Sequence, residues 1–441
     1  QRQSARSTAR RTDLARAAGM RQYALAYISR RPEGTTAAMA ARVLRPEGKG
    51  FIFLDSHPAG CAATVDAMIS ETTHAREATA PSREPRALVL GCSAGYGLAA
   101  AVTGLFGYQA RVVGLCYERP ATPRRSASAG WYRVAALASR AAAAGLEFDP
   151  VNGDCFDPAV RAQVLDRAAA TLGTIDVLIY SIAAPRRTDP QSGIVYHSAV
   201  KPIGTAYRTR NVAFADGVVL RESSHEPATD AEIEATVKVM GGEDWAAWVT
   251  DLAARGMLAP GFQTAALTYV GSELTAPIYR QGTIGRAKDH LEATAGELTG
   301  GVLRQAGGTA FTSVHCAAVT LSSLAIPGIS LYLSLLHKVA ADATESPVRQ
   351  SIRLWDHLAG LLGSSTDSQG RLRLDDAELA ADVQRALRER WQATTEDLTE
   401  GLADLDWFRA QIWQLYGFDV PGVNYGQPVE VDVPWPVRRE R

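Results

Sequence analysis

Short apolar runs alternate with longer amphipathic segments between about residue 87 and residue 183. The apolar runs are bounded by glycine or charged residues, as buried strands are, and each intervening segment is long enough for a helix of several turns. This βαβαβ order predicts a parallel sheet with helices on both faces, an α/β doubly wound fold of the Rossmann type. The predicted strands are residues 87–91, 111–118 and 175–183, and the predicted helices are residues 96–107, 131–146 and 157–173.

The pattern changes after this region. Residues 185–228 are dense in proline, arginine and threonine, so we expect a long irregular excursion at the carboxyl edge of the sheet, where ordered loops tend to be functional. The apolar stretch 317–336 is interrupted by Pro327 and Gly328, which favours two short buried helices over a membrane span. The remaining predicted elements are a strand at 264–270, a helix from about residue 286 and a helical C-terminal third.

Charge is distributed unevenly along the chain. The 441 residues carry a net charge of −1, which argues against a protein that binds nucleic acid by overall electrostatics. Residues 1–45, however, hold ten arginines and only two acids, Asp13 and Glu33. This composition is typical of a mitochondrial or plastid targeting region, with a disordered tail as the alternative. We therefore divide the chain into a basic N-terminal arm, residues 1–45, and a single domain, residues 46–441.

The five cysteines are scattered, and the sequence contains no Cys-x-x-Cys pair and no pair of histidines at metal-ligand spacing. A zinc site or a disulfide framework is therefore not expected, and the candidate site is predicted to hold no metal. Each cysteine is expected to be a small buried apolar residue in a protein of a reducing compartment.

A glycine-rich turn is the first candidate for a ligand site. The sequence GCSAGYG, residues 91–97, follows the first predicted strand and opens the first predicted helix. Glycines let the backbone approach a ligand closely, and the N-terminus of the helix offers free N–H groups to a pyrophosphate. The strand–turn–helix context favours dinucleotide binding, and a tight turn without a ligand is the alternative.

Acidic and small residues stand at the ends of the following strands. Glu118 ends the second strand, where a carboxylate can accept hydrogen bonds from the adenosine ribose and repel a 2′-phosphate, which favours NADH. Arg119, Arg124 and Arg125 follow closely and could instead accommodate that phosphate, so NADPH remains an alternative. The other positions at strand ends are Asp154, beside the expected adenine, and Ser181, Ile182 and Ala183, beside the expected nicotinamide ribose.

Tyr279 and Lys288 lie nine positions apart in the segment APIYRQGTIGRAKDH. A tyrosine–lysine pair is typical of one large group of nicotinamide enzymes, in which the spacing is four because such positions share one face of a helix. Nine positions on a continuous helix would put the two side chains on opposite faces. Pro277, Gly282 and Gly285 argue against a continuous helix, so a loop that carries Tyr279 can fold back towards a helix that carries Lys288. The residues alone leave this arrangement and a surface location for both side chains open.

Further short motifs follow one another over nearly the whole chain after Lys49. They are KGFIFLDSHPAGC, GCSAGYGLA, AGWY, NGDCF, YSIAAPRRTDP, KPIG, VKVMGGEDW, YVGSE and YGFDVPGVNY. Together with the Tyr-x8-Lys spacing, this ordered set resembles the trans-2-enoyl-CoA/acyl-carrier-protein reductase family of the FabV and TER type. The resemblance is strongest to the mitochondrial eukaryotic branch, whose members serve fatty-acid and wax-ester synthesis.

The resemblance implies a short-chain-dehydrogenase-like domain that reduces the trans-2 double bond of an enoyl thioester with NADH. Tyr279 would be the proton donor, Lys288 a catalytic lysine that contacts the cofactor, and Tyr269 a substrate contact. Extra lid helices at about residues 317–345 would cover the acyl chain. The implied cofactor-binding positions are Gly91, Cys92, Ser93, Ala94, Gly95, Tyr96, Tyr117, Glu118, Asp154, Cys155, Ile182, Ala183, Lys288, Ala318, Val319 and Thr320.

The sequence departs from the family pattern near Tyr279. The family places tryptophans where this chain has Ala276 and Arg280, and it places glutamine and proline where this chain has Leu321 and Ser330. These departures remove apolar surface beside the acyl site and add a cation. Two expectations follow: an NADH-dependent enoyl reductase of the mitochondrial matrix, or a reductase-like accessory subunit of a mitochondrial respiratory complex that binds a dinucleotide structurally. The basic arm would dock the domain on a larger assembly.

Overall fold

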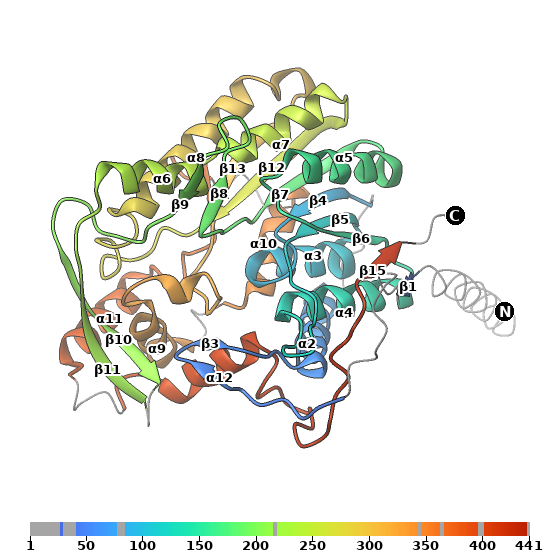
Figure 1. Ribbon diagram of the computed structural model, residues 1–441. Helices are drawn as coiled ribbons and strands as arrows, with labels where there is room; N and C mark the ends of the chain where they lie inside the picture. The colour runs from blue at the N-terminus through green and yellow to red at the C-terminus, as the bar shows by residue number, and fades with distance from the viewer. Residues whose placement is uncertain are drawn as a thin grey trace, which may run out of the picture.

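Seven strands form the central sheet of the computed structural model (Figure 1). The structure describes residues 27–29, 41–76, 84–214, 218–341, 345–361, 366–395 and 401–438. Most of the predicted basic arm, residues 1–26 and 30–40, lies outside these ranges. Every neighbouring pair of strands is parallel. In sheet order the strands are β14 (Arg371–Arg373), β13 (Thr309–Val314), β12 (Leu258–Thr268), β7 (Ile175–Tyr180), β4 (Arg86–Leu90), β5 (Arg111–Cys116) and β6 (Phe148–Asn152).

Helices cover both faces of this sheet and bury two apolar cores against it (Figure 1). The strand order reverses between β4 and β7, and ligands of doubly wound sheets bind at such a reversal. The α/β doubly wound fold predicted from the sequence is therefore confirmed. One face carries α2 (Pro58–Arg76), α3 (Gly95–Tyr108), α4 (Ala129–Ala143) and α10 (Pro347–Leu358), and the other carries α5 (Pro158–Leu172), α7 (Glu243–Ala254) and α8 (Thr283–Gly300), with α6 (Asp230–Met240) packed on α8.

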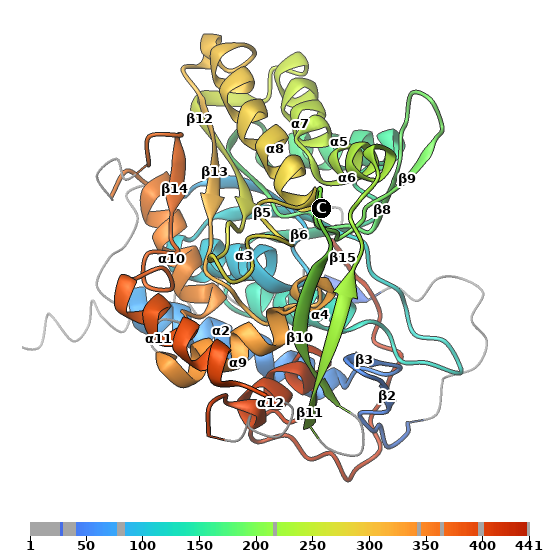
Figure 2. The same ribbon diagram turned by 90° about the vertical axis from the view of Figure 1, so that its left-hand side faces the viewer.

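A third apolar cluster lies outside the sheet and is built mainly from the C-terminal part of the chain. Its centre is α9 (Ile329–Val339), whose buried leucines contact α11 (Ala381–Ala393) and α12 (Leu405–Leu415). The hairpin of β10 (Tyr207–Phe214) and β11 (Val218–His225) closes one side of the cluster (Figure 2). The cluster thus joins the C-terminal helices to the region that follows β7.

Residues 185–228 differ from the irregular excursion that we predicted. They contain two antiparallel hairpins, one of β8 (Arg186–Thr188) with β9 (Val195–His197) and one of β10 with β11. Among the hairpin side chains whose burial the structure describes, the buried apolar ones are Val212 and Leu220, which lie against α9. The prediction was wrong because polar and charged residues interrupt both strands of the longer hairpin, which therefore lack the apolar run that marks a core strand.

The apolar stretch 317–336 forms one α-helix rather than the two that we predicted. Gly328 has a positive φ of 83°, and α9 begins directly after it. Before this point the structure has only the 3-10 turn Ser323–Ala325, because the side chains of Thr320 and Ser323 each accept a hydrogen bond from the other residue's amide. None of the helices in the described part of the chain combines the length and the apolar character that crossing a membrane requires.

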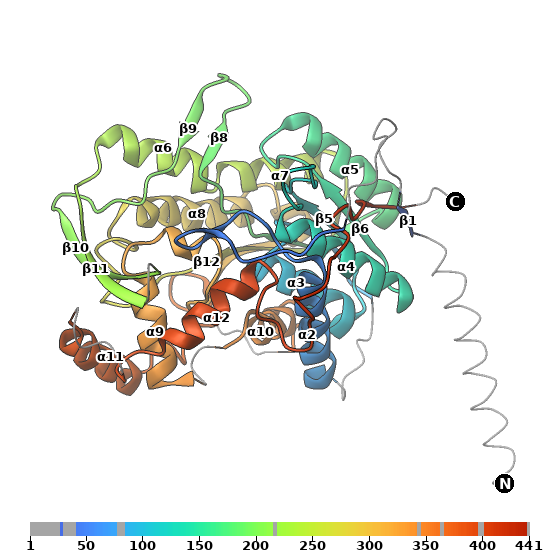
Figure 3. The same cartoon turned by 60° about the horizontal axis from the view of Figure 1, so that its bottom comes forward.

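Residues 41–45, the last of the predicted arm, pack on the domain. Arg42 forms an ion pair with Asp55 (3.1 Å) and exchanges backbone hydrogen bonds with Val429, and Leu44 is buried beside Phe418. The hairpin of β2 (Gly48–Lys49) and β3 (Ile52–Phe53) follows and reaches α12 (Figure 3). These five residues therefore belong to the packed domain.

The two ends of the described chain meet beside α4. Strand β1 (Tyr27–Ser29) pairs antiparallel with β15 (Pro436–Arg438). The segment before β15 lies along α4, where the Trp131 indole donates a hydrogen bond to the carbonyl of Val433 (2.7 Å). A C-terminal strap, by which we mean residues 415–438, therefore covers α4 and the β6 edge of the sheet.

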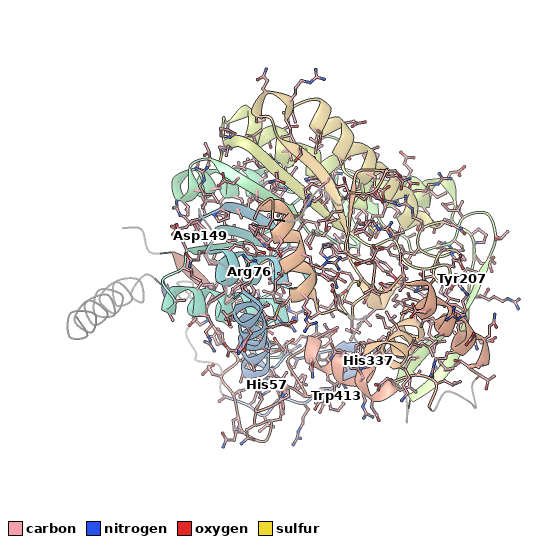
Figure 4. All side chains as sticks on the ribbon, turned by 180° about the vertical axis from the view of Figure 1, so that it is seen from behind. His57, Arg76, Asp149, Tyr207, His337 and Trp413 are labelled. Carbon is pink, nitrogen blue, oxygen red and sulfur yellow. The ribbon has the colours of Figure 1, made fainter. Side chains whose placement is uncertain are left out.

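Helix α10 packs closely on α3 and fixes the C-terminal part against the sheet. A Cβ at Gly104 would lie 2.5 Å from the Trp355 ring, so glycine is needed there for the indole to reach α3. The Trp355 indole donates a hydrogen bond to the carbonyl of Ala100 (2.9 Å), and its ring stacks on Tyr108 with centroids 5.4 Å apart. Arg76, at the end of α2, places its guanidinium over the same Tyr108 ring (Figure 4).

We expect Trp355→Ala to lower the free energy of unfolding by about 3–5 kcal/mol, because it leaves a cavity over Gly104 that α3 cannot fill. Denaturant titration measures the change. Leu361→Ala is the control, since that leucine is 57% exposed and its loss should change stability by no more than about 0.5 kcal/mol. Similar losses in the two variants would show that the indole does not anchor α10.

Candidate active site

The glycine turn between β4 and α3 has no room for side chains at two positions. Gly91 has a φ of 90°, and a Cβ there would clash with the carbonyl oxygen of Ser181 on the next strand. A Cβ at Gly97 would clash in turn with the carbonyl oxygen of Gly91. No side chain caps the N-terminus of α3 at Ala94. The first N–H groups of α3 are therefore open to an anion such as a pyrophosphate.

Glu118 is held in place at the end of β5. Its two carboxylate oxygens accept hydrogen bonds from the hydroxyls of Ser93 (2.6 Å) and Ser128 (2.5 Å). Its backbone amide and carbonyl are both bound by the side chain of Asn152, and its carboxylate occupies the space that a Cβ at Gly130 would need. The hydrogen bond from Ser93 thus holds the carboxylate beside the glycine turn. Its remaining lone pairs can accept hydrogen bonds from ribose hydroxyls.

The segment after β13 and the end of β7 also face the glycine turn. The Thr320 side chain lies 3.4 Å from the position of a Cβ on Gly95, and the Ile182 side chain lies 3.4 Å from that of a Cβ on Gly91. The Tyr96 hydroxyl donates a hydrogen bond to the carbonyl of Cys316, just before this segment. The structure therefore brings the predicted positions of three distant stretches together around one turn.

The remaining predicted cofactor positions differ in how much surface they expose. Cys92 is fully buried beneath the turn, so only its backbone can reach a ligand, whereas the Tyr117 side chain is 72% exposed at the rim. Burial also raises the pKa of the Cys155 thiol, which makes it a neutral apolar neighbour. Asp154 accepts a hydrogen bond from the amide of Phe156 (3.0 Å) in the turn after β6. Ala183 is exposed, and Ala318 and Val319 are half-buried.

Tyr279 lies in a turn that folds back onto the start of α8. Its carbonyl oxygen accepts hydrogen bonds from the amides of Gly282 (3.2 Å) and Gly285 (2.9 Å). A Cβ at Gly285 would clash with the carbonyl oxygen of Arg280, so glycine is required for the loop to close. Lys288 follows in the second turn of α8. The turn that carries Tyr279 thus folds back onto the helix that carries Lys288, which is one of the two arrangements that the sequence left open.

The polar groups of Tyr279 and Lys288 stand outside the hydrogen-bond network that the described residues form. Among the described residues, none forms a hydrogen bond or ion pair with the Tyr279 hydroxyl or the Lys288 ammonium, although Tyr279 is only 6% exposed. Burial raises the pKa of Tyr279 and lowers that of Lys288 to about 8, the latter opposed by Glu292. Lys288 is half-buried, so both polar groups are available to a ligand.

Glu378, which the sequence does not single out, is fully buried beside the site. Its Oε1 accepts hydrogen bonds from the hydroxyls of Tyr269 (2.8 Å) and Tyr332 (2.7 Å), and its Oε2 accepts one from the amide of Ala317 (2.5 Å). Burial raises its pKa to about 7, and these three donors oppose the rise. The Tyr269 ring lies edge-on to that of Tyr279, with centroids 5.0 Å apart. The hydroxyl of the predicted substrate contact is therefore tied to a buried carboxyl group.

Arg280, one of the departures from the family pattern, is paired with acids of α8. Its guanidinium makes two hydrogen bonds to Glu292 (2.9 and 3.1 Å) and an ion pair with Asp289 (3.0 Å). Ser330, another departure, accepts a hydrogen bond from the amide of Val212 and links α9 to β10. The added cation is thus neutralised on the outer side of the turn, and the expectation that it alters the acyl site has no support in these contacts.

A tyrosine and a lysine beside a phosphate-binding turn are typical of the nicotinamide-dependent oxidoreductases with a Rossmann fold. Family profiles identify one family within this class of enzymes. The profile "Trans-2-enoyl-CoA reductase catalytic region" matches residues 125–358, and "NAD(P)H binding domain of trans-2-enoyl-CoA reductase" matches residues 43–123. The chain belongs to the trans-2-enoyl-CoA reductase family, and residues 43–123 are its NAD(H)-binding part.

Several bacterial proteins are similar over almost their full length. An enoyl-[acyl-carrier-protein] reductase [NADH] of Streptomyces avermitilis is 51% identical over 89% of this chain and 100% of its own length. A trans-2-enoyl-CoA reductase [NADH] of Clostridium perfringens is 42% identical over 88% of this chain and 99% of its own. The crystal structure of Treponema denticola trans-2-enoyl-CoA reductase in complex with NAD has a TM-score of 0.82 and 38% identity, covering 91% of this chain and 100% of that one. The resemblance to the mitochondrial branch stays a prediction.

A third profile, "Enoyl reductase FAD binding domain", matches residues 366–429, but the residues there do not fit a flavin. In the described ranges 366–395 and 401–429, no glycine turn joins a strand to a helix in the way that cradles a pyrophosphate. The apolar side chains of this part, including Leu387, Phe408 and Ile412, are fully buried against α9. We therefore assign no flavin chemistry to it.

We expect the stability of the protein to depend on pH through Glu378. Between the ordinary pKa of 4.5 and the folded pKa of about 7, the folded state keeps a proton that the unfolded state has lost. The free energy of unfolding therefore falls as pH rises through this window, by on the order of 3 kcal/mol from this group. Denaturant titrations at several pH values should show a smaller decline in Glu378→Gln than in the wild type. Parallel curves would mean that Glu378 is ionised throughout.

Proposed function

We propose that the protein reduces the trans-2 double bond of enoyl thioesters with NADH. The observation that carries this proposal is the pair formed by Tyr279 and Lys288. Their polar groups have no protein partner in the described part of the chain, and one turn–helix unit presents both of them. Relatives that are 42% and 51% identical are named as NADH-dependent reductases of enoyl-CoA and of enoyl-acyl carrier protein.

The residues of the site suit this chemistry. NADH, when bound at the glycine turn, supplies a hydride to the β-carbon of the substrate. Negative charge then develops on the thioester oxygen, and the Tyr279 hydroxyl donates a hydrogen bond or a proton there, which is worth a few kcal/mol. The Lys288 ammonium holds ribose hydroxyls, and its positive charge lowers the pKa of a neighbouring phenol.

Glu118 favours NADH over NADPH. Its carboxylate lies beside the glycine turn, where a 2′-phosphate would meet a negative charge. Arg119, Arg124 and Arg125 are exposed, and none of them forms an ion pair with Glu118 in the part of the chain that the structure describes. No arginine of this group therefore shields the Glu118 side chain from a 2′-phosphate.

We expect Tyr279→Phe to lower kcat for crotonyl-CoA by about 100-fold or more while the Kd of NADH changes little. The hydroxyl acts on charge that exists only in the transition state, so its loss falls on kcat. Stopped-flow turnover and NADH fluorescence titration measure the two constants. Tyr425→Phe is the matched control, because that hydroxyl is bound by the amide of Val420 in a separate cluster.

Two outcomes would count against the assignment. Equal losses of turnover and NADH affinity in Tyr279→Phe would make Tyr279 a binding residue. A wild-type protein that binds NADH yet reduces neither crotonyl-CoA nor crotonyl-acyl carrier protein would overturn the enzymatic proposal. That result would favour the reductase-like accessory subunit of a mitochondrial respiratory complex.

We further propose that the arm of residues 1–45 docks the domain on a larger assembly in the mitochondrial matrix. The supporting observation is charge: the arm carries a net +8, from ten arginines and two acids, and the other residues carry −9, from 36 basic and 45 acidic groups. Strand β1 pairs with β15, and Arg42 and Leu44 pack on the domain, so the informative deletion ends at residue 26.

A chain without residues 1–26 should fold, bind NADH and lose its attachment to mitochondrial membranes or complexes. The full chain should detach as salt rises, because exposed charges are screened within about 10 Å at 0.1 M salt. Co-sedimentation at increasing salt measures the attachment. If the shortened chain unfolds, or sediments at the same salt concentration as the full chain, the arm is not a docking segment.

A further inference from the structure

The hydrogen bonds around Glu378 leave open which partner holds each proton. Glu378 has no exposed surface, and no lysine, arginine or histidine forms an ion pair with it in the described part of the chain. A carboxylate without a counter-ion is expensive to bury, so the neutral acid competes with the ionised form near neutral pH. The two forms demand different directions for the hydrogen bonds of Tyr269 and Tyr332.

When Glu378 is ionised, it can only accept hydrogen bonds. Both tyrosine hydroxyls must then donate to its Oε1, at 2.8 Å from Tyr269 and 2.7 Å from Tyr332. A phenol has a single proton, so the Tyr269 oxygen offers only lone pairs to anything on its other side. An oxygen that carries developing negative charge beside Tyr269 would be repelled by them.

When Glu378 is protonated, its proton must lie on Oε1, because Oε2 accepts the hydrogen bond from the amide of Ala317 (2.5 Å). The acid can then donate to one of the two tyrosine oxygens. Tyr332 already accepts a hydrogen bond from the side-chain amide of Gln384 (3.3 Å), so Tyr269 is the freer acceptor. Its own proton is thereby released and can turn towards the face that it shares with Tyr279.

From this geometry we infer that Glu378 is a positioning residue, whose protonation makes the hydroxyl proton of Tyr269 available to the thioester oxygen. The inference rests on the proposed function, since it concerns the same developing charge that Tyr279 stabilises. The protonated form of Glu378 gives that charge two donors, Tyr279 and Tyr269. The ionised form leaves the charge one donor, Tyr279, while the lone pairs of Tyr269 repel it. We therefore expect kcat to be lower at high pH.

Other ionisable groups surround Glu378, and their contribution must be separated from its own. Tyr96 on α3, Cys316 after β13 and Tyr332 on α9 all have raised pKa values and stay neutral near pH 7, as does Tyr269. Asp375, on the same segment as Glu378, forms an ion pair with Arg373 (2.7 Å). Lys288, whose pKa burial lowers to about 8, is the group near the site that titrates in a neighbouring range.

Glu378→Gln separates these contributions because it copies the protonated acid. Its amide oxygen can accept from Ala317 N, and its NH2 group can donate to Tyr269, at every pH. We expect the ratio of kcat in Glu378→Gln to kcat in the wild type, with NADH and crotonyl-CoA, to rise by about tenfold or more as pH rises through 7, because losing a donor to a developing oxyanion costs at least that much. KM should change little. Titration of Lys288 is common to both proteins and cancels in the ratio.

Three further variants test the route through Tyr269. Tyr269→Phe should have a low kcat that no longer depends on residue 378, so the double variant Tyr269→Phe/Glu378→Gln should match it. Tyr332→Phe is the control, because it removes the other hydroxyl on Oε1, which opposes the rise in the Glu378 pKa: kcat should still fall as pH rises, with its midpoint at a higher pH than in the wild type. A constant ratio across the pH range, or effects of the two substitutions that multiply, would overturn the inference.

A measurement without turnover separates this inference from the proposed function. Infrared difference spectra of the wild type against Glu378→Gln should show a protonated carboxyl group below pH 7 that disappears above it. Absence of that signal throughout the range overturns the inference even if the enzyme is active. Conversely, the signal with no reduction of either thioester would leave Glu378 a titrating group in a protein whose proposed function has failed.

Discussion

The position of Tyr279 depends on a turn that leaves no room for a side chain at Gly285. The carbonyl of Tyr279 accepts the amide of Gly285, and a Cβ at that glycine would clash with the backbone of Arg280. The turn therefore closes directly on the first residues of α8, which carries Lys288. Because α8 packs on β13 and α6, the sheet itself fixes where the phenol and the ammonium stand. The same turn directs Arg280 outward, towards Asp289 and Glu292.

The C-terminal third of the chain contributes side chains that hold the site in place. Gln350 of α10 accepts the amide of Cys316 (2.7 Å), and Glu378 accepts that of Ala317, so two buried side chains hold the segment that faces the glycine turn. Glu378 also binds Tyr269 at the end of β12. The segment after β13 and the site tyrosines are therefore positioned by elements that a minimal doubly wound sheet does not contain, which explains why the fold needs its additional helices.

The sequence predicted the parts of the molecule in which one residue pattern corresponds to one physical environment. The strands and helices between residues 87 and 183 are found close to their predicted ends, because buried strands and alternating helices have distinct periods. The β10–β11 hairpin was missed because polar and charged residues interrupt both of its strands, which therefore lack a continuous apolar run. The nine-residue spacing of Tyr279 and Lys288 was interpretable only through the family resemblance. Glu378 could not be found at all, since it stands in an acidic stretch typical of solvated loops and its partner Tyr269 is 109 residues away.

The C-terminal strap over α4 has a consequence for the order in which the chain can fold. Trp131 and Tyr132 hydrogen-bond to the carbonyls of Val433 and Val431, which follow them by 302 and 299 residues. Ribosomes add roughly 5–20 residues per second, so the strap residues that contact α4 are synthesised on the order of 15–60 s after the helix itself. During that interval the side chains of α4 that the strap later covers stay exposed. The packing of this part of the protein is therefore complete only after the last residues have been translated.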